Sequence, residues 1–334
     1  MPLKTPEEYV QSLNDGRVTY WDGERIDDIT THPRFRVPIA VAARDYAATE
    51  GGRNAVHAYR TETGDHAHRV FQIPRSEEDL NARVEMMHDM SIVGGVTGVM
   101  MALMSVKDQV AAVNPMYAEN IERLYAYVRD NDLRAAEVIT DPKGDRSKRA
   151  HEQDDPDLYV RIVRRTDEGI VVRGAKLHIT AASLVHELVV MPTKSMRPEE
   201  ADYAVAFSIP VNTPGVSIIN RSFAPAELNS FDYPASARHS MPEGFVVFDD
   251  VFIPWEDVFV YRDIEVVRAQ FFDTPAHILG NSQAQIRLVV KLQFLAGIAR
   301  KLAAATKIDL IPSVQEKLGE LASLASIVEG MVVA

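Results

Sequence analysis

The sequence predicts a multidomain α+β protein in which a helical region, a strand-rich region and a second helical region follow one another. Three changes of pattern predict this order. Apolar residues recur at helical spacing through residues 1–134, short runs rich in Val, Ile and aromatics fill 135–265, and helical spacing returns over 266–334. We expect one domain for each range, since 334 residues exceed the usual size of a single domain.

The first region contains several helix signals. TPEEYVQSL, from Thr5, and SEEDLNARVEMMHDM, from Ser76, each begin with a capping hydroxyl and an acidic first turn. NPMYAENIERLYAYVRD, residues 114–130, repeats apolar side chains at helical spacing. Residues 90–106 form an uncharged run of 17 residues with three glycines. That length is at the lower edge of what spans a bilayer, so we expect a buried helix rather than a membrane span.

The middle region contains short strands separated by Gly, Pro, Asn and Asp. The strands are LYVRIVRRT, GIVVRGAKLHIT, HELVVMPTK, YAVAFSIPV, VSIINRS and FVVFDDVFIP. Such regular spacing predicts an antiparallel β-barrel or sandwich. Beyond residue 266, QAQIRLVVKLQFLAGIARKLAAAT and IPSVQEKLGELASLASIVEGMVVA predict two helices of a bundle, the second of which runs into the chain end without a capping Gly or Pro.

Composition excludes several classes of function. The net charge of −12 repels nucleic acid and anionic membranes, and no basic cluster offsets it. The chain has no cysteine, which excludes disulfides, thiolate nucleophiles and cysteine-ligated iron–sulfur clusters. No zinc-binding histidine motif, serine-hydrolase elbow, Rossmann fingerprint or P-loop is present. The N-terminus lacks a secretory signal, so we expect a cytoplasmic protein. Because no metal-binding motif is visible, we also expect no bound metal.

Residues 139–148, ITDPKGDRSK, form the strongest candidate site. Pro142 and Gly144 indicate a loop, in which Lys143, Arg146 and Lys148 supply positive charge. Backbone N–H groups and a cation in such a loop are suited to a phosphate-bearing cofactor. A polar linker between domains is the alternative.

A second candidate is the strand GAKLHITAAS, residues 174–183. Lys176, His178 and Thr180 alternate along it, so we expect their side chains on one face, where they could hydrogen-bond a polar heterocycle. A solvated outer face is the alternative. The aromatic segment VFIPWEDVFVYRD, residues 251–263, is expected either to line a pocket or to pack two domains together.

Four of these segments, in order, resemble one flavoprotein family. LNDGRVTYWDGERIDDITTHPRFR, ITDPKGDRS, GAKLHITAAS and IPWEDVFVYRD are similar to motifs of the family that contains 4-hydroxyphenylacetate 3-monooxygenase and 4-hydroxybutyryl-CoA dehydratase. The resemblance implies an acyl-CoA dehydrogenase-like fold: a helical N-terminal domain, a β-barrel and a C-terminal four-helix bundle. The chain is shorter at its C-terminus than the family pattern, which implies either a truncated product or completion by a partner chain.

The resemblance also implies roles for individual residues. FAD would contact Ile139, Thr140, Asp141, Lys143, Gly144, Asp145, Arg146, His178 and Thr180. Thr180, His178 and Arg146 would be the catalytic residues, with the Thr180 hydroxyl near the reactive edge of the flavin. Val93, Val96, Met100, Met101 and Glu137 occupy positions where the monooxygenase branch binds its phenol, so they would line an apolar substrate pocket.

The branches of the family imply different reactions. The dehydratase branch binds a [4Fe–4S] cluster through three cysteines and a histidine, but this chain has Asp89, Val93, Pro254 and Tyr261 near those positions. We therefore expect a flavin-dependent monooxygenase that hydroxylates a small aromatic or related substrate with FADH2 from a separate reductase. A cluster-free relative acting on an acyl-CoA, such as a vinylacetyl-CoA isomerase, and a non-catalytic subunit are the alternatives. Exposed apolar helix faces also predict a homo- or hetero-oligomer.

Overall fold

The computed structural model of the chain describes residues 3–192, 194–221 and 229–334. The chain divides into two compact units. One unit comprises residues 1–73 and 90–280, and the other comprises residues 74–89 and 281–334. The three-part division expected at residues 134/135 and 265/266 stays a prediction.

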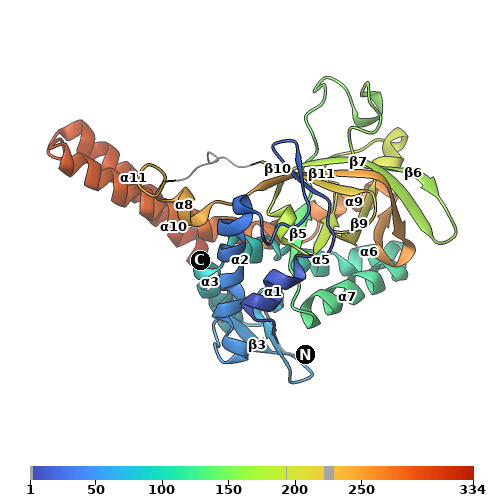
Figure 1. Cartoon of the computed structure of the whole chain (residues 1–334), viewed down its shortest axis with the longest axis horizontal. Helices are drawn as coiled ribbons and strands as arrows, with labels where there is room; N and C mark the ends of the chain where they lie inside the picture. Colours follow the sequence, from blue (N-terminus) through green and yellow to red (C-terminus); the bar gives the residue numbers. More distant parts are fainter. Residues whose placement is uncertain (1–2, 193, 222–228) are drawn as a thin grey trace. The chain divides into compact units, whose positions relative to one another are not determined.

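The larger unit contains a six-stranded sheet (Figure 1). Its strands, in spatial order, are β2 (Glu24–Ile26), β1 (Thr19–Trp21), β10 (Val216–Arg221), β11 (Glu243–Pro254), β7 (Gly169–Thr180) and β6 (Arg161–Arg165). All neighbours are antiparallel except β1 and β10. The N-terminal region, expected to be mostly helical, therefore adds two strands to this sheet.

A four-stranded sheet packs against the first. Its order is β12 (Val258–Tyr261), β9 (Val205–Pro210), β8 (Glu187–Val190) and β5 (Ala135–Val138), with β5 and β8 parallel. Phe207 of β9 meets Phe248 of β11 edge to face, with ring centroids 6.0 Å apart, and both rings are buried. The strand region predicted as a barrel thus consists of two hydrogen-bonded sheets that share a core.

Some helices of the larger unit begin at a capping side chain and others do not. The helices are α1 (Pro6–Ser12), α2 (Arg36–Ala48), α4 (Ile92–Val96), α5 (Val99–Ser105), α6 (Lys107–Val113), α7 (Pro115–Asp130), α8 (Ser236–His239) and α9 (Ile264–Phe272). Thr5 and Glu8 form a capping box on α1, and the Asn114 side chain caps α7. The predicted apolar stripe of α7, from Ile121 to Val128, is buried, because this helix packs on β12.

The uncharged run at residues 90–106 is buried, as predicted, but it is not one helix. Gly98 and Thr97 separate α4 from α5, and the Thr97 hydroxyl bonds the Val93 carbonyl oxygen at 2.9 Å. No single described helix has the length and hydropathy to span a membrane. One bent pair, 92–105 with 107–113, meets that criterion by length and composition only.

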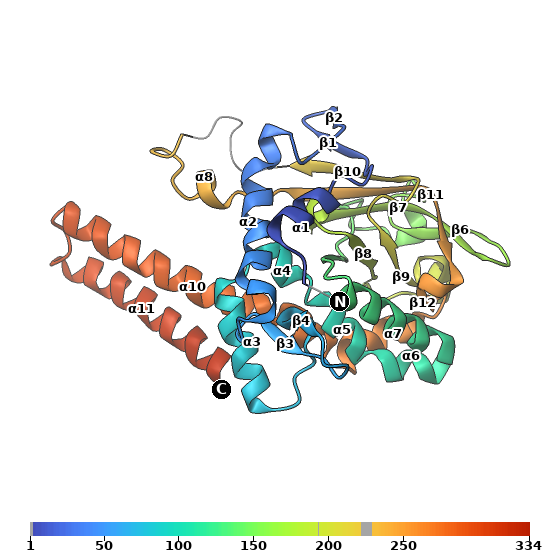
Figure 2. The ribbon, with the colours of Figure 1, turned by 60° about the horizontal axis from the view of Figure 1, so that its bottom comes forward.

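The smaller unit contains α3 (Glu77–Asp89), the greater part of α10 (Ala276–Ala305) and α11 (Pro312–Val333). Helices α10 and α11 form an antiparallel hairpin, seen side by side in Figures 1 and 2. The less exposed residues of the two helices recur every three or four positions: Val289, Leu292, Ala296, Ala299 and Ala303 on α10, and Val314, Leu318, Leu321, Ala325, Val328 and Val332 on α11. This heptad-like spacing defines the line along which the hairpin closes.

A buried polar cluster fixes the start of β5, the strand that leads into the candidate loop. Arg134 is fully buried, lies 3.0 Å from Asp132 and places its guanidinium 4.1 Å over the Tyr46 ring. His186 Nδ1 accepts the Arg134 backbone N–H at 3.0 Å, and its Nε2 lies 2.8 Å from the Ser12 hydroxyl. Burial and the nearby cations lower the pKa of His186 well below its usual value, so the ring is neutral.

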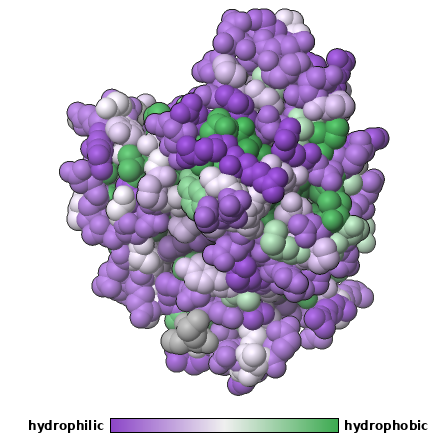
Figure 3. All heavy atoms as spheres, turned by 90° about the vertical axis from the view of Figure 1, so that its right-hand side faces the viewer, coloured by the Kyte–Doolittle hydropathy of each residue, from purple (hydrophilic) through white to green (hydrophobic). Residues whose placement is uncertain are grey.

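One face of the molecule is mainly hydrophilic. The face shown in Figure 3 has small hydrophobic patches separated by hydrophilic residues. That distribution is ordinary for a folded protein surface, on which single apolar side chains carry no functional meaning.

Glu187 on β8 generates a prediction about pH and stability. Its carboxyl is 4% exposed, its one hydrogen-bond donor in the described chain is Ser208 at 3.2 Å, and burial raises its pKa to about 8. Between roughly pH 4.5 and 8 the unfolded chain ionises at this residue and the folded chain does not. The wild type therefore loses about 1.4 kcal/mol of stability per pH unit there. Glu187→Gln removes this loss, so its advantage in urea unfolding grows from pH 5 to 8.

The matched control is Glu24→Gln, on an exposed carboxyl of β2. We expect no growing difference from the wild type for this variant. A Glu187→Gln advantage that stays constant between pH 5 and 8 would contradict the assignment of a protonated buried carboxyl.

Candidate functional site

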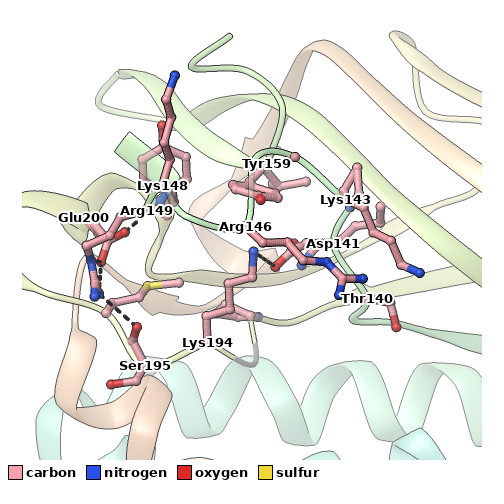
Figure 4. A pocket seen from close by; sticks show the side chains of 18 of the residues that line it. Thr140, Asp141, Lys143, Arg146, Lys148, Arg149, Tyr159, Lys194, Ser195 and Glu200 are labelled. Atoms are coloured by element: carbon pink, nitrogen blue, oxygen red, sulfur yellow. Dashed lines mark hydrogen bonds and ion pairs between the residues drawn. The ribbon is translucent and has the colours of Figure 1, made fainter. Parts of the chain in front are cut away.

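A cavity of about 750 Å³ lies under the loop that follows β5 (Figure 4). The loop forms one wall, and β7, the end of β8, the start of β9 and the 3-10 turn of residues 198–203 form the others. The lining side chains include Thr140, Asp141, Lys143, Arg146, Lys148, Arg149, Tyr159, Lys176, Lys194, Met196 and Glu200. This volume is within the range of small-molecule and cofactor sites.

Lys176 on β7 holds the start of the loop in place. Its ammonium donates to the Ile139 carbonyl oxygen at 2.8 Å, to Asp141 Oδ1 at 2.8 Å and to the Met191 carbonyl oxygen at 3.2 Å. These contacts use all three donors of the ammonium. The residue is 2% exposed, and burial lowers its pKa, against the opposing effect of Asp141. Lys176 thus joins the loop to β7 and to the end of β8.

The strand that carries Lys176 does not keep the predicted alternation. Lys176 pairs with Val246 and Ile179 with Gly244, so β7 has one more residue than β11 between these pairs. This bulge includes His178, whose φ of +57° is left-handed. Lys176 and Ile179 are buried and His178 is exposed. The expectation that Lys176, His178 and Thr180 share one face is wrong, because the bulge shifts the alternation between them.

Thr180, at the end of β7, pairs with a carboxylate that the sequence did not single out. Its hydroxyl lies 3.1 Å and 3.2 Å from the two oxygens of Glu243, the facing residue on β11. Neither Thr180 nor His178 lines the cavity beneath the loop. Their contact with a flavin stays a prediction.

The loop itself is held by internal bonds. The Gln153 side chain donates to the Asp145 carbonyl oxygen at 2.9 Å and accepts the Asp145 N–H at 3.0 Å. Gly144 packs so closely on Gln153 and Leu158 that a Cβ at this position would collide with both side chains. Asp145 also accepts the Ser147 N–H at 2.9 Å. The path of the loop is therefore set by the chain itself, before any ligand binds.

Some cations of the cavity are paired with groups of the chain itself. Arg149 pairs with Glu200 at 3.0 Å and Lys148 pairs with Asp154, whereas Lys194 lies 3.5 Å from Asp141 and 3.5 Å from the centre of the Tyr159 ring (Figure 4).

The loop cations Lys143 and Arg146 differ from the paired cations. Both are exposed, and within residues 3–192, 194–221 and 229–334 neither has an ion-pair or hydrogen-bond partner. These two charges are available to an anionic ligand.

The predicted substrate residues lie apart from this cavity. Val93, Met100 and Met101 are at most 3% exposed and pack in the core of α4 and α5, while Val96 is partly exposed. None of them, nor Glu137, lines the cavity beneath the loop. Their role as a substrate pocket stays a prediction.

Glu137 is mostly buried on β5. Its side chain packs against Gly280 of α10. A Cβ added to Gly280 would lie 3.2 Å from Glu137 Oε1, and its next neighbour would be Ala102. Burial raises the pKa of Glu137, and no ion pair within the described ranges opposes this effect. Burial thus makes the protonated form of this carboxyl, which can donate a hydrogen bond, easier to reach than in an exposed glutamate.

Sequence patterns did not identify Tyr159, Lys194 and Glu243. Gly174 gave an indirect signal for Tyr159, because its φ of +131° and its lack of a side chain let the Tyr159 backbone approach β7. No local signal marks Lys194 or Glu243, since only the fold brings them to the loop and to Thr180. The part of the chain that the structure describes holds no group of three His, Asp or Glu residues arranged to bind a metal.

Two family descriptions together match nearly the whole chain. Residues 5–260 match the family described as 4-hydroxyphenylacetate 3-hydroxylase N terminal, and residues 267–334 match the C-terminal family of the same name. The chain therefore belongs to the 4-hydroxyphenylacetate 3-hydroxylase family.

Individual relatives agree with this family. The oxygenase component of 4-hydroxyphenylacetate 3-monooxygenase from Geobacillus sp. (strain PA-9) is 31% identical over 333 residues, which cover 96% of this chain and 67% of the relative. The chain thus spans about two thirds of the length of that protein.

Solved structures share the fold. The oxygenase component of 4-hydroxyphenylacetate 3-monooxygenase, complexed with FAD and 4-hydroxyphenylacetate, matches with a TM-score of 0.88 and 29% identity over 98% of this chain and 70% of that chain. An oxygen-tolerant archaeal 4-hydroxybutyryl-CoA dehydratase from N. maritimus matches with a TM-score of 0.85 and 26% identity over 99% of this chain and 68% of that chain. These matches confirm the predicted fold class and family.

Replacing Lys176 tests its role as the anchor of the loop. Lys176→Met leaves Asp141 and two carbonyl oxygens buried without their donor, so we expect the free energy of unfolding in urea to fall by about 3–5 kcal/mol. Lys194→Met is the matched control, because the Lys194 side chain is 46% exposed; its cost should stay below about 1 kcal/mol. Equal losses for the two variants would show that Lys176 has no special role.

Proposed function

We propose that the chain is an FAD-dependent oxidoreductase of the two-component monooxygenase type. Its FAD would arrive reduced, as FADH2 from a separate reductase, and its substrate would be a small aromatic or related molecule. The observation that carries the proposal is a pair of cations, Lys143 and Arg146, that have no partner among the described residues. They lie on a preformed loop, within the matched range 5–260, that borders a cavity of about 750 Å³.

The residues of the cavity fit the chemistry of FAD. Lys143 and Arg146 supply charge for the diphosphate, and Arg146 can bind two phosphate oxygens at once through its planar guanidinium. The loop residues from Ile139 to Asp145 would contact the cofactor along its length. When bound in reduced form, FAD supplies the electrons with which oxygen is activated.

The chain's own residues would hold and orient the reactants. Thr180 donates its proton to Glu243, so the lone pairs of its oxygen are left to accept a hydrogen bond from the flavin ring. His178, exposed in the bulge, would contact the same ring. Glu137 would hydrogen-bond the substrate, in a pocket otherwise lined by Val93, Val96, Met100 and Met101.

A second candidate function has one specific observation in its favour. The fold matches a 4-hydroxybutyryl-CoA dehydratase almost as well as a monooxygenase. A cluster-free member of that branch would shift a double bond in an acyl-CoA on FAD. A non-catalytic subunit is the third candidate. We further propose that the protein is cytoplasmic and oligomeric.

Titration with flavins tests the cofactor proposal. We expect Arg146→Ala to weaken FAD binding about tenfold or more, because it removes a charged hydrogen-bond donor worth ~1.5 kcal/mol, and to leave riboflavin binding unchanged. Arg164→Ala, an exposed arginine on β6 outside the cavity, is the control and should bind FAD like the wild type. A wild type that binds neither FAD nor FADH2 would refute the proposal and favour a non-catalytic subunit.

The reaction is tested with reduced FAD. We expect the wild type, supplied with NADH, a flavin reductase and oxygen, to hydroxylate simple para-substituted phenols. Glu137→Ala should lower the rate, since it removes a hydrogen-bonding group, and Glu137→Gln should restore part of it. Migration of the double bond of vinylacetyl-CoA without phenol hydroxylation would instead establish the second candidate.

A further inference from the structure

The side chain of Glu137 has no partner in the part of the chain that the structure describes. No hydrogen bond or ion pair joins its carboxyl to another described residue, and the residue is partly exposed, so a ligand can reach it. We propose that this carboxylate binds an ammonium group of the substrate, which makes the substrate a cationic phenol and not an anionic one. The inference rests on the proposed function, because it names the class of substrate for the same pocket.

The elements around Glu137 supply no positive charge. Helices α4 and α5, which pack on β5, contain no charged residue and no histidine, and Glu137 is the one charged residue of β5 itself. Near Gly280, the first turn of α10 contains one titratable residue, His277, which is exposed. These elements therefore provide no counter-charge for Glu137.

The two buried cations beside β5 are already paired. Arg134, directly before the strand, lies 3.0 Å from Asp132. Lys176, on the neighbouring strand β7, lies 2.8 Å from Asp141. Burial alone raises the pKa of Glu137, and a carboxylate in such a place is costly unless a donor of opposite charge meets it. An ammonium group offsets that cost, because it brings both the charge and the hydrogen-bond donors.

Gly280 keeps space beside the carboxyl. Glycine destabilises a helix relative to alanine, yet it stands near the start of α10, where a Cβ would come within 3.2 Å of Glu137 Oε1. Non-bonded heavy atoms ordinarily lie about 3.5–4.0 Å apart, so an alanine would crowd this oxygen. The next neighbour of that Cβ, Ala102 of α5, is also small. Two small residues thus leave Oε1 open to a donor.

Charge decides which substituent of the substrate suits this region. Glu137 would repel a carboxylate, and a neutral group would leave the carboxyl without a counter-charge. The net charge of −12 on the whole chain also attracts cations and repels anions before they bind. The preferred substrate is therefore a phenol with an aliphatic ammonium group.

Three phenols that differ in charge test the inference by calorimetry, on the chain loaded with oxidised FAD and without a reductant. Tyramine, 4-ethylphenol and 3-(4-hydroxyphenyl)propanoate share a two-carbon chain, which carries an ammonium group, no charge and a carboxylate respectively. We expect tyramine to bind about tenfold more tightly than 4-ethylphenol, and the propanoate to bind most weakly.

Equal binding of tyramine and 4-ethylphenol, tightest binding of the propanoate, or no binding of any of the three would overturn the inference. Because no turnover is measured, these results leave the proposed function standing as long as FAD binds. A chain that binds no FAD refutes the proposed function and this inference with it.

A change of charge at constant size assigns the preference to Glu137. We expect tyramine to lose its advantage over 4-ethylphenol in Glu137→Gln. Glu187→Gln is the matched control, because it makes the same change at a buried carboxyl of β8, the strand beside β5, and it should keep the advantage. A Glu137→Gln chain that still prefers tyramine tenfold would overturn the inference.

Gly280→Ala tests the space beside the carboxyl. We expect it to weaken tyramine binding severalfold in the wild type and to have no effect in Glu137→Gln, because the added methyl group acts by crowding Oε1. Gly297→Ala, on the same helix, adds a methyl group where no atom outside the helix backbone lies within 4 Å, and should change nothing. An equal loss from Gly280→Ala in both backgrounds would contradict the role given to Gly280.

Discussion

The buried ammonium of Lys176 is the contact on which the arrangement of the site depends. It joins three stretches of chain that are distant in sequence: the start of the loop at Ile139 and Asp141, its own strand, and the end of β8 at Met191. A buried charge is tolerable only when its partners are in place, so the loop and the two sheets must fold together. The exact path of the loop is therefore a property of the core and not of a flexible surface segment.

Other contacts also fix the position of β5 and of the loop. The polar cluster of Arg134, Tyr46 and His186 fixes the start of β5, and Gln153 holds the loop after it has left Lys176. Because most cations of the cavity are neutralised within the chain, Lys143 and Arg146 stand out as the charges left for a ligand. In a preorganised anion site, buried residues hold the loop in position and exposed residues bind the anion.

Local patterns predicted much of the fold and part of the site. The caps of α1 and α7 and the apolar stripe of α7 are local signals, and the loop at residues 139–148 was evident from its Pro, Gly and charges. The bulge in β7 was not predictable. No sequence pattern marks a histidine whose backbone is left-handed, and in the sequence Lys176, His178 and Thr180 alternate without a break. The partners of Lys176 and Thr180 depend on contacts between strands, which periodicity does not encode. The family resemblance identified the cofactor class, which the residues alone left open.

A crystal structure of the chain grown with FAD tests the central claim most directly: the loop anchored by Lys176 is the binding surface for the cofactor diphosphate. The account predicts phosphate oxygens within hydrogen-bonding distance of Lys143 and Arg146, with Lys176 still bonded to Ile139 and Asp141. FAD bound elsewhere while these two cations face solvent, or bound to a loop that has left Lys176, would contradict it.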